Sequence, residues 1–345
     1  MGENPQKKQK VNDINGAELR TYTAQRVLGL GSFGVVYQAH VSESGETVAV
    51  KAMRLTEKDK EIQVLREFID HPNIVQLKGA FISKEEANIA PKLNVIMEFC
   101  SDTLHRVIKH NKKLGQQMDP LKMKIYHYQL LRGLNFVHMK GFVHCDIKPQ
   151  NLLIDGKSHT LKLCDFGTAQ RLMFGDTTLR SYMCSRFYRP PELILGSVSY
   201  DTSVDLWCAG CVFGEMLLGQ PLFTGKDGIN QLVEIMKVLG TPTAADLKAM
   251  NPHFPDYKFS PEMPPLKWHD MFPKGEKLAL EMVGSLLRYN PSSRLTPMQG
   301  LLHAYFDTPL RNGKSRNFGP PLFNFREDEL WLLLPEERKK LIPAE

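Results

Sequence analysis

Residues 144–153 (HCDIKPQNLL) carry three polar side chains at short intervals, Asp146, Lys148 and Asn151. At this spacing the three can converge at the end of one rigid loop. A carboxylate such as that of Asp146 can accept a proton from an attacking hydroxyl, a lysine can neutralise a phosphoryl group in transfer, and an asparagine can bind metal. The segment therefore predicts group-transfer chemistry, with Asp146 and Lys148 as catalytic residues.

A second carboxylate stands nineteen residues beyond Asp146, in the triplet Asp165-Phe166-Gly167. A carboxylate beside a flexible glycine is suited to hold Mg²⁺ against a phosphate group. Asp165 and Asn151 are therefore the candidate metal ligands. Either segment alone is compatible with a surface turn, but the two at this spacing indicate a functional site.

A glycine-rich run, residues 29–34 (GLGSFG), contains the pattern GxGxxG. Glycine lets the backbone approach phosphate oxygens closely and permits turns that a side chain would block. In a dinucleotide-binding fold the third glycine opens a helix, whereas here Val35, Val36 and Tyr37 follow. The run predicts a phosphate-binding hairpin, with a purely structural turn as the alternative.

Lys51 ends the apolar run 48–50, seventeen residues after Gly34. There its ammonium group would lie beneath the hairpin, where a point charge suits the α- and β-phosphates of a nucleotide. An ordinary edge lysine is the alternative for this residue taken alone.

The lysine needs an anionic partner, and the helix-like stretch 57–69 offers candidates. Glu61 borders the apolar face of that stretch, and Glu57 lies one turn earlier on the same side. Glu61 is the expected partner, whereas Glu67 is expected to face solvent.

The elements that position these residues belong to a chain of 345 residues. A single core stops growing at ~250–300 residues, so two units are expected. With 42% hydrophobic and 24% charged residues, the composition excludes a disordered chain and a disulfide scaffold. Lys and Arg total 44 against 38 Asp and Glu, a formal charge of +6, with no dense basic stripe in the text. A nucleic-acid partner is therefore not expected.

The six cysteines fall at irregular spacings, and no secretory segment opens the sequence. Reduced thiols are expected, in the cytoplasm with the nucleus as a second compartment. Cys208 and Cys211 read as small core residues rather than as half of a zinc site. No run of 18 uncharged apolar residues exists, so no membrane association is expected.

Hydrophobic periodicity changes near residues 98–102. Residues 21–97 read as strands with one helix, and residues 1–20 as a loosely held tail. Beyond residue 99, helical spacing recurs at 120–140, 203–219, 228–239 and 275–289. The expected fold class is α+β, a small β-rich unit followed by a larger α-helical unit.

Three further polar residues are expected to have structural roles. Glu192 in an apolar setting requires a cation, and Arg294 is the natural one. Asp205 begins an apolar helix and is expected to be a cap or a backbone anchor.

These motifs resemble those of the eukaryotic protein kinases over roughly residues 22–310. The chain is most similar to the glycogen synthase kinase-3 family, in the group (CMGC) that also contains the cyclin-dependent and mitogen-activated kinases. The finer likeness is carried by segments 161–167, 181–189, 231–235, 238–243 and 322–325.

The resemblance implies a serine/threonine protein kinase of bilobal fold that uses ATP and Mg²⁺ and acts on protein substrates. It implies a flexible tail (1–20), an N-lobe (21–98), a C-lobe (99–310) and a C-terminal extension that packs on the kinase domain (311–345). ATP would lie between the lobes, with adenine bonded to the backbone of Glu98 and Cys100. The positions matched to the nucleotide site are Leu28, Gly29, Gly31, Ser32, Phe33, Gly34, Val36, Ala49, Lys51, Glu61, Met97, Glu98, Cys100, Leu153 and Cys164.

Three positions depart from the family pattern without removing a catalytic group. Cys145 replaces the arginine of the HRD motif, Pro190 replaces an alanine, and Gln170 replaces the lysine after the DFG segment. Glycogen synthase kinase-3 reads a priming phosphate four residues beyond its target with three basic side chains. Lys60, Cys145 and Gln170 occupy those positions here, which implies an altered priming pocket and weak or absent priming dependence.

The resemblance also implies regulation and docking. Tyr182 matches a tyrosine that the family's kinases phosphorylate themselves, and its phosphate would pair with Arg186 and Arg189. The segment 252–274 matches an insert that offers a docking surface for scaffold proteins.

Two other functions stay open at this point. A cyclin-dependent or mitogen-activated kinase is disfavoured because the helix bearing Glu61 lacks a PSTAIRE-like sequence and Tyr182 lacks a threonine two residues before it. A nucleotide-binding scaffold without turnover is disfavoured because every catalytic group is present.

Overall fold

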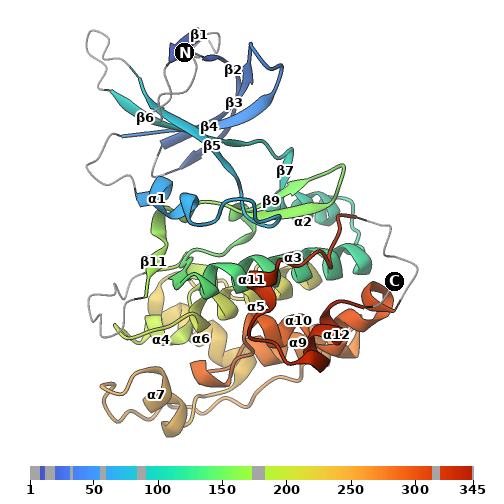
Figure 1. Ribbon diagram of the computed structural model, residues 1–345. Coiled ribbons are helices and arrows are strands. Elements are labelled where there is room, and N and C mark those ends of the chain that lie inside the picture. Colours follow the sequence, from blue (N-terminus) through green and yellow to red (C-terminus); the bar gives the residue numbers. More distant parts are fainter. Residues whose placement is uncertain are drawn as a thin grey trace. The chain divides into compact units, whose positions relative to one another are not determined.

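The structure is a computed structural model that describes residues 8–11, 20–31, 34–54, 60–83, 91–172, 183–312 and 319–343. It divides into two units, Met1–Ser101 and Asp102–Glu345, and most of their elements are labelled in Figure 1. The division falls three residues beyond the lobe boundary that the sequence suggests, after Ser101 rather than after Glu98.

One antiparallel sheet of six strands, in the order β1-β2-β3-β4-β6-β5, forms the frame of the first unit. Its strands are β1 (Lys8–Val11), β2 (Arg20–Gly31), β3 (Gly34–Val41), β4 (Thr47–Arg54), β5 (Leu77–Ile82) and β6 (Lys92–Glu98). The sequence predicts a loose tail over 1–20, and β1 corrects this in part. Strand β1 pairs with β2 through the backbone, with Lys8 opposite Thr23, and the polar side chains of this segment do not predict that pairing.

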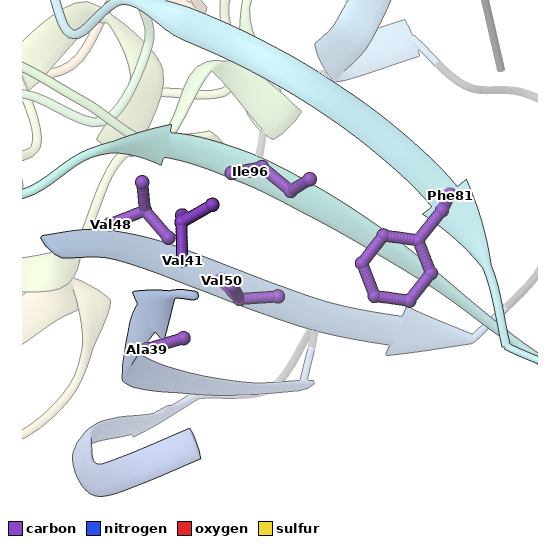
Figure 2. Packing of buried hydrophobic residues seen from close by; sticks show 6 residues of the cluster. All are labelled: Ala39, Val41, Val48, Val50, Phe81 and Ile96. Carbon is purple, nitrogen blue, oxygen red and sulfur yellow. The ribbon is translucent and has the colours of Figure 1, made fainter. Parts of the chain in front are cut away.

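The core of this sheet comes from side chains that alternate along the strands and face one side. Figure 2 shows the cluster, in which no member exposes more than 3% of its surface. Tyr22 stacks on it, with its ring 5.6 Å from that of Phe81. The cluster consists of Ala39, Val41, Val48, Val50, Phe81 and Ile96.

The described part of the single helix expected in this unit is α1 (Lys60–Arg66). It buries Ile62, Val64 and Leu65 on one side, and Glu61 is buried with them. Glu67 is exposed, as the sequence predicts.

The second unit is mostly helical. Its helices are α2 (Leu104–Lys113), α3 (Pro120–Met139), α4 (Pro191–Ile194), α5 (Ser203–Leu218), α6 (Gly228–Leu239), α7 (Ala244–Met250), α8 (Trp268–Met271), α9 (Lys277–Leu286), α10 (Pro297–Leu301), α11 (Glu327–Leu330) and α12 (Pro335–Leu341). The helical periodicity of the sequence correctly predicts α3, α5, α6 and α9. No helix among the described residues is both long and apolar enough to cross a membrane.

Short strands complete the second unit and carry the residues of interest. They are β7 (Asp102–Thr103), β8 (Phe142–Val143), β9 (Leu152–Asp155), β10 (Thr160–Leu163) and β11 (Gln170–Arg171). They pair as β10-β9-β7 and as β11-β8. The residues between β8 and β9, and those between β10 and β11, contain the two carboxylate motifs of the sequence.

The centre of the second unit is formed by α3 and α5, whose residues are buried along almost their whole length. Asp119 caps α3 by accepting a hydrogen bond from the backbone of Lys122. Trp207 of α5 is fully buried and stacks on Phe223 at 5.9 Å. Helix α5 also anchors the residues that follow β8, because Asp205 accepts hydrogen bonds from the backbone of His144 and Cys145.

Residues 322–329 pack on α3, and the buried Arg132 makes several of the contacts. Arg132 forms two charge-assisted hydrogen bonds with Glu329, both 2.9 Å long. Its guanidinium also donates to Asn324 and lies 4.3 Å from the ring centre of Phe325. Phe323 and Phe325 also lie edge-on to the ring of Tyr128, and Arg326 lies over the ring of Phe136, so several polar and aromatic contacts tie this segment to α3.

Candidate functional site

In the first unit, Lys51 and Glu61 form a buried ion pair. Lys51 lies on the central strand β4 and exposes 7% of its surface, and Glu61 exposes 4%. The ammonium nitrogen Nζ is 2.9 and 2.7 Å from the two carboxylate oxygens. The anionic partner that the sequence predicts for Lys51 is therefore in place, while Glu57 lies outside the described residues.

Of the glycine-rich run, Gly29 and Gly31 lie at the end of β2 and Gly34 begins β3, with Gly31 opposite Gly34 in the register. Gly34 has φ +146°, and a Cβ there would lie 2.0 Å from the carbonyl oxygen of Ala52. Only glycine fits this position. Gly29 is exposed with open space around it, so its lack of a side chain serves no packing need. Ser32 and Phe33 lie outside the described residues.

The other positions matched to the nucleotide site fall into two groups. In the first unit, Ala49 on β4 and Met97 on β6 are buried opposite each other, and Leu28, Val36, Glu98 and Cys100 are half-buried. In the second unit, Leu153 on β9 and Cys164 after β10 are half-buried.

In the second unit, Asp146 is the centre of a compact polar cluster. Lys148 Nζ donates to its Oδ2 at 2.6 Å, and Asn151 Nδ2 donates to the same oxygen at 3.1 Å. The other oxygen, Oδ1, accepts from the backbone nitrogen of Ser185 at 3.1 Å and from its hydroxyl at 2.7 Å. The three residues that the sequence places on one loop therefore do converge.

Opposing effects set the protonation of Asp146. Burial raises the pKa of its carboxyl, but the hydrogen bond and charge of Lys148, with the hydroxyl of Ser185, more than offset burial. The net pKa lies below the usual value. Asp146 is thus ionised at neutral pH and able to accept a hydrogen bond or a proton.

Sequence reasoning missed Ser185. Its hydroxyl oxygen receives a hydrogen bond from Lys148 Nζ at 2.8 Å and donates to Asp146. The residue lies 39 positions beyond Asp146 in the chain. Its place inside the segment 181–189 was the one available signal, and that signal does not specify a contact.

Asp205 of α5 anchors the loop that bears Asp146. The Asp205 carboxylate accepts hydrogen bonds from the backbone nitrogens of His144 (2.8 Å) and Cys145 (3.0 Å), and from His138 Nε2 (2.8 Å). Cys145 itself has a left-handed backbone, φ +65°, a conformation that costs energy outside glycine. Asp205 is therefore the backbone anchor that the sequence predicts, and it fixes the strained loop.

The candidate metal ligands Asn151 and Asp165 lie on neighbouring segments. The backbone nitrogen of Cys164, next to Asp165, donates to the carbonyl of Asn151 at 3.0 Å. The Cys164 carbonyl is in turn 3.0 Å from His144 Nε2. Asp165 has φ +65° and is followed by Phe166, which is fully buried.

The oxygen atoms of these two residues suit a hard cation. Both hydrogen bonds of the Asn151 side chain use its nitrogen, which directs its amide oxygen elsewhere. Among the described residues, no three or more His, Cys, Asp or Glu side chains could hold a metal by themselves. Mg²⁺ does not need such a cage, because it typically takes one or two carboxylates with phosphate oxygens and water. The donor set therefore fits Mg²⁺ bound together with a nucleotide.

Glu192 and Arg294 form the second buried ion pair that the sequence predicts. Both guanidinium nitrogens lie 2.7 Å from the carboxylate oxygens, and neither side chain exposes more than 2%. The guanidinium also lies 5.1 Å from the ring centre of Trp207 and donates to the carbonyl of Ser203. The pair therefore connects α4 and the chain before α10 to the start of α5.

Three residues correspond, by the family resemblance, to those that would recognise a priming phosphate, and each has different surroundings. Cys145 is fully buried and packs with Val143 and Leu193. Gln170 lies on β11, where its amide donates to the carbonyl of Thr168 at 3.3 Å. Lys60, at the start of α1 in the first unit, is half-buried.

The proposed regulatory arginines both contact backbone carbonyls. Arg186 is exposed and donates to the carbonyl of Lys226 at 2.5 Å. Arg189 is buried and donates to the carbonyls of Met183 and Cys184, both at 2.9 Å. Tyr182 lies outside the described residues.

A β-sheet unit and a helical unit with these motifs define the class of fold found in protein kinases. Residues 22–306 match the family described as the protein kinase domain, and the chain belongs to that family. Membership makes it a phosphotransferase with protein substrates that uses a nucleoside triphosphate and a divalent metal ion.

Proposed function

We propose that the protein is a serine/threonine protein kinase that transfers the γ-phosphate of ATP, with Mg²⁺, to hydroxyl groups of protein substrates. One observation carries the proposal. The ionised Asp146 already accepts a hydrogen bond from a serine hydroxyl, that of Ser185, at 2.7 Å. This is the contact that a substrate hydroxyl requires before its oxygen attacks.

The residues of the helical unit divide the work of the transfer. Asp146 orients the substrate hydroxyl and takes its proton as the new oxygen–phosphorus bond forms and the bond to the leaving ADP oxygen breaks. Lys148, 2.6 Å from Asp146, places positive charge where the transferring phosphoryl group is most negative. Asp165 and Asn151 would hold Mg²⁺, which supplies charge neutralisation at the phosphates.

In the first unit, Lys51 contributes a second fixed charge. Glu61 holds the ammonium group in place, so that the lysine meets the α- and β-phosphates without reorganising. Gly34, where no side chain fits, would let the backbone approach the same phosphates closely. Catalysis is then mostly positioning and electrostatics.

Within the kinases, the likeness of segments 161–167 and 181–189 supports a protein of the CMGC group that is similar to glycogen synthase kinase-3. The altered residues Cys145 and Gln170 support a kinase that does not depend on priming. The same proposal includes self-phosphorylation at Tyr182 and action in the cytoplasm and nucleus. It also includes binding of scaffold proteins at the insert 252–274, where Tyr257 is 58% exposed.

The test is a transfer assay with labelled ATP, Mg²⁺ and serine, threonine and tyrosine peptides, on the wild type and Asp146→Asn. We expect label on serine or threonine and a loss of at least a hundred-fold in the variant. Equal rates in both proteins would remove the proposal. ATP binding without any transfer would favour the nucleotide-binding scaffold instead.

A further inference from the structure

Helix α2 gathers positive charge that the linear sequence disperses. Six of its ten residues, LHRVIKHNKK, are Lys, Arg or His, and none is acidic. The chain shows no dense basic stripe when read in order, but a helix brings positions i, i+3, i+4 and i+7 onto one face. That face, which we call the α2 basic stripe, consists of Arg106, Lys109, His110 and Lys113.

The stripe points into solvent, because the opposite face of α2 is in the core. All four of its side chains are exposed, whereas Leu104 and Ile108 are buried. Arg106 makes one long contact, 3.7 Å, with the half-buried Asp102. In the described part of the chain, Lys109, His110 and Lys113 have no side-chain partner.

The stability of helix α2 explains only part of this arrangement of positive charges. Cations in the last turn, such as Lys113, interact favourably with the helix dipole. Arg106 lies in the first turn, where the dipole disfavours a cation, and Lys109 lies in the middle. Lys109 and Lys113 are also like charges four residues apart, which destabilises a helix. The stripe is therefore a surface that folding alone does not require.

The α2 basic stripe begins next to the loop that bears Asp146, Lys148 and Asn151. His105, the neighbour of Arg106, lies 3.4 Å from Gln150 Nε2, and Gln150 adjoins Asn151. From Arg106 to Lys113 the helix rises about 10 Å, which an extended peptide covers in about three residues. A polypeptide with its hydroxyl at Asp146 can thus place a short run of residues along α2.

We propose that the α2 basic stripe binds acidic residues of the protein substrate, and so gives the kinase a preference for serine or threonine flanked by a run of Asp or Glu. This inference rests on the proposed function. It adds the class of substrate sequence that the site selects.

A protein segment fits the stripe better than a membrane or a nucleic acid does. Helices that bind membranes insert an apolar face, and that face of α2 is already buried in the core. Nucleic-acid surfaces are usually wider basic patches, whereas this one has three cations and a histidine on a single face. A short acidic peptide matches the stripe in length and charge.

The experiment uses the full chain and three peptides with the same serine acceptor. One has neutral flanks, and two carry three glutamates on either the amino- or the carboxyl-terminal side. Dissociation constants come from fluorescence anisotropy and kcat/KM from phosphate transfer. The variant is Lys109→Glu with Lys113→Glu, and the control is Lys339→Glu with Lys340→Glu, an equal charge change at exposed positions of α12.

We expect at least one acidic peptide to bind about ten-fold more tightly than the neutral one, since several exposed charge contacts add up to that much. The preference should weaken with salt, vanish in the α2 variant and persist in the control. Turnover of the neutral peptide should be the same in all three proteins.

Each other result is decisive. Turnover without any acidic preference, or a preference that survives the α2 variant, would overturn the inference while leaving the kinase function intact. Binding preference without turnover would contradict the proposed function but not the surface. Binding of RNA or of phosphatidylserine vesicles that depends on Lys109 and Lys113, with no peptide preference, would assign the stripe to a different partner and overturn the inference.

Discussion

Asp146 accepts four hydrogen bonds, two on each carboxylate oxygen, from Lys148, Asn151 and the backbone and hydroxyl of Ser185. Such a carboxylate is both fixed in place and kept ionised. The Ser185 hydroxyl occupies a position beside Asp146 and Lys148 together, so it acts on the orientation of both groups. Ser185 is therefore a positioning residue. Its loss is expected to change the pKa of Asp146.

Replacing Ser185 with alanine should shift the pH dependence of the reaction. The Ser185 hydrogen bond is one of the causes that lower the pKa of Asp146, so its removal raises that pKa. Activity falls as pH falls through the pKa of the base, and the acid limb of the kcat/KM profile should therefore move to higher pH. At neutral pH we expect a loss of about ten-fold, the worth of one charge-assisted hydrogen bond.

The matched control for that profile is Ser185→Thr, which keeps the hydroxyl. Its acid limb should coincide with that of the wild type. An acid limb that stays in place in Ser185→Ala would show that the hydroxyl does not tune Asp146.

Lys51 has two roles that substitutions can separate. Lys51→Met removes the charge at the phosphates and also leaves Glu61 buried without its ion-pair partner, which costs about 3–5 kcal/mol of folding stability. The double variant Lys51→Met/Glu61→Gln removes both charges and should regain most of that stability. Urea denaturation measures this recovery.

Phosphate transfer should not recover in the double variant. We expect both variants to lose at least a hundred-fold in transfer at saturating ATP, since only the lysine charge serves the phosphates. Transfer within a few-fold of the wild type in either variant would contradict the role of Lys51.

At the scale of elements, the sequence predicts what local periodicity encodes. Helices α3 and α5 are visible as long runs rich in apolar residues, because both are buried along nearly their whole length. Helix α2 carries Leu104, Val107 and Ile108 on one face, but it is only ten residues long and most of its other positions are charged, so it offers too short an apolar pattern for a prediction. The strand β1 depends on backbone pairing with β2, which side chains do not report.

Contacts between elements follow chemistry rather than periodicity. The pairs Lys51–Glu61 and Glu192–Arg294 are predictable because a buried charge requires an opposite one. Ser185 is not, because a serine has no such requirement and its partner lies 39 residues away. The contact of the site that the sequence does not predict is therefore the one made by an uncharged residue far away in the chain, Ser185.

The ion pair of Glu192 and Arg294 should determine the stability of the helical unit. Arg294→Met leaves the buried Glu192 of α4 without its cation, at a cost of about 3–5 kcal/mol. Arg294→Lys keeps the charge but loses the bidentate geometry, so its cost should be intermediate. Urea denaturation measures both, and equal stability of wild type and Arg294→Met would show that the pair contributes nothing.

At the scale of the whole molecule, we propose that charge determines which substrates the kinase accepts. In glycogen synthase kinase-3, to which we propose that this chain is similar, three cations read a priming phosphate four residues beyond the target. Here one position is Lys60, and the others are the buried Cys145 and Gln170, whose amide donates to a backbone carbonyl. Two cations are absent, and the remaining lysine lacks the bidentate fork of arginine.

We therefore expect little or no preference for primed substrates. Each charge-assisted hydrogen bond to a phosphate is worth ~1.5–3 kcal/mol when well desolvated, or roughly ten- to hundred-fold in affinity. Steady-state kinetics on one peptide, with and without phosphoserine four residues after the acceptor, should give kcat/KM values within a few-fold of each other. A primed peptide favoured a hundred-fold, with the preference lost in Lys60→Ala, would mean that Lys60 with other cations rebuilds the phosphate site. The same comparison in the α2 variant Lys109→Glu/Lys113→Glu separates that site from the basic stripe, because only a preference due to the stripe would disappear there.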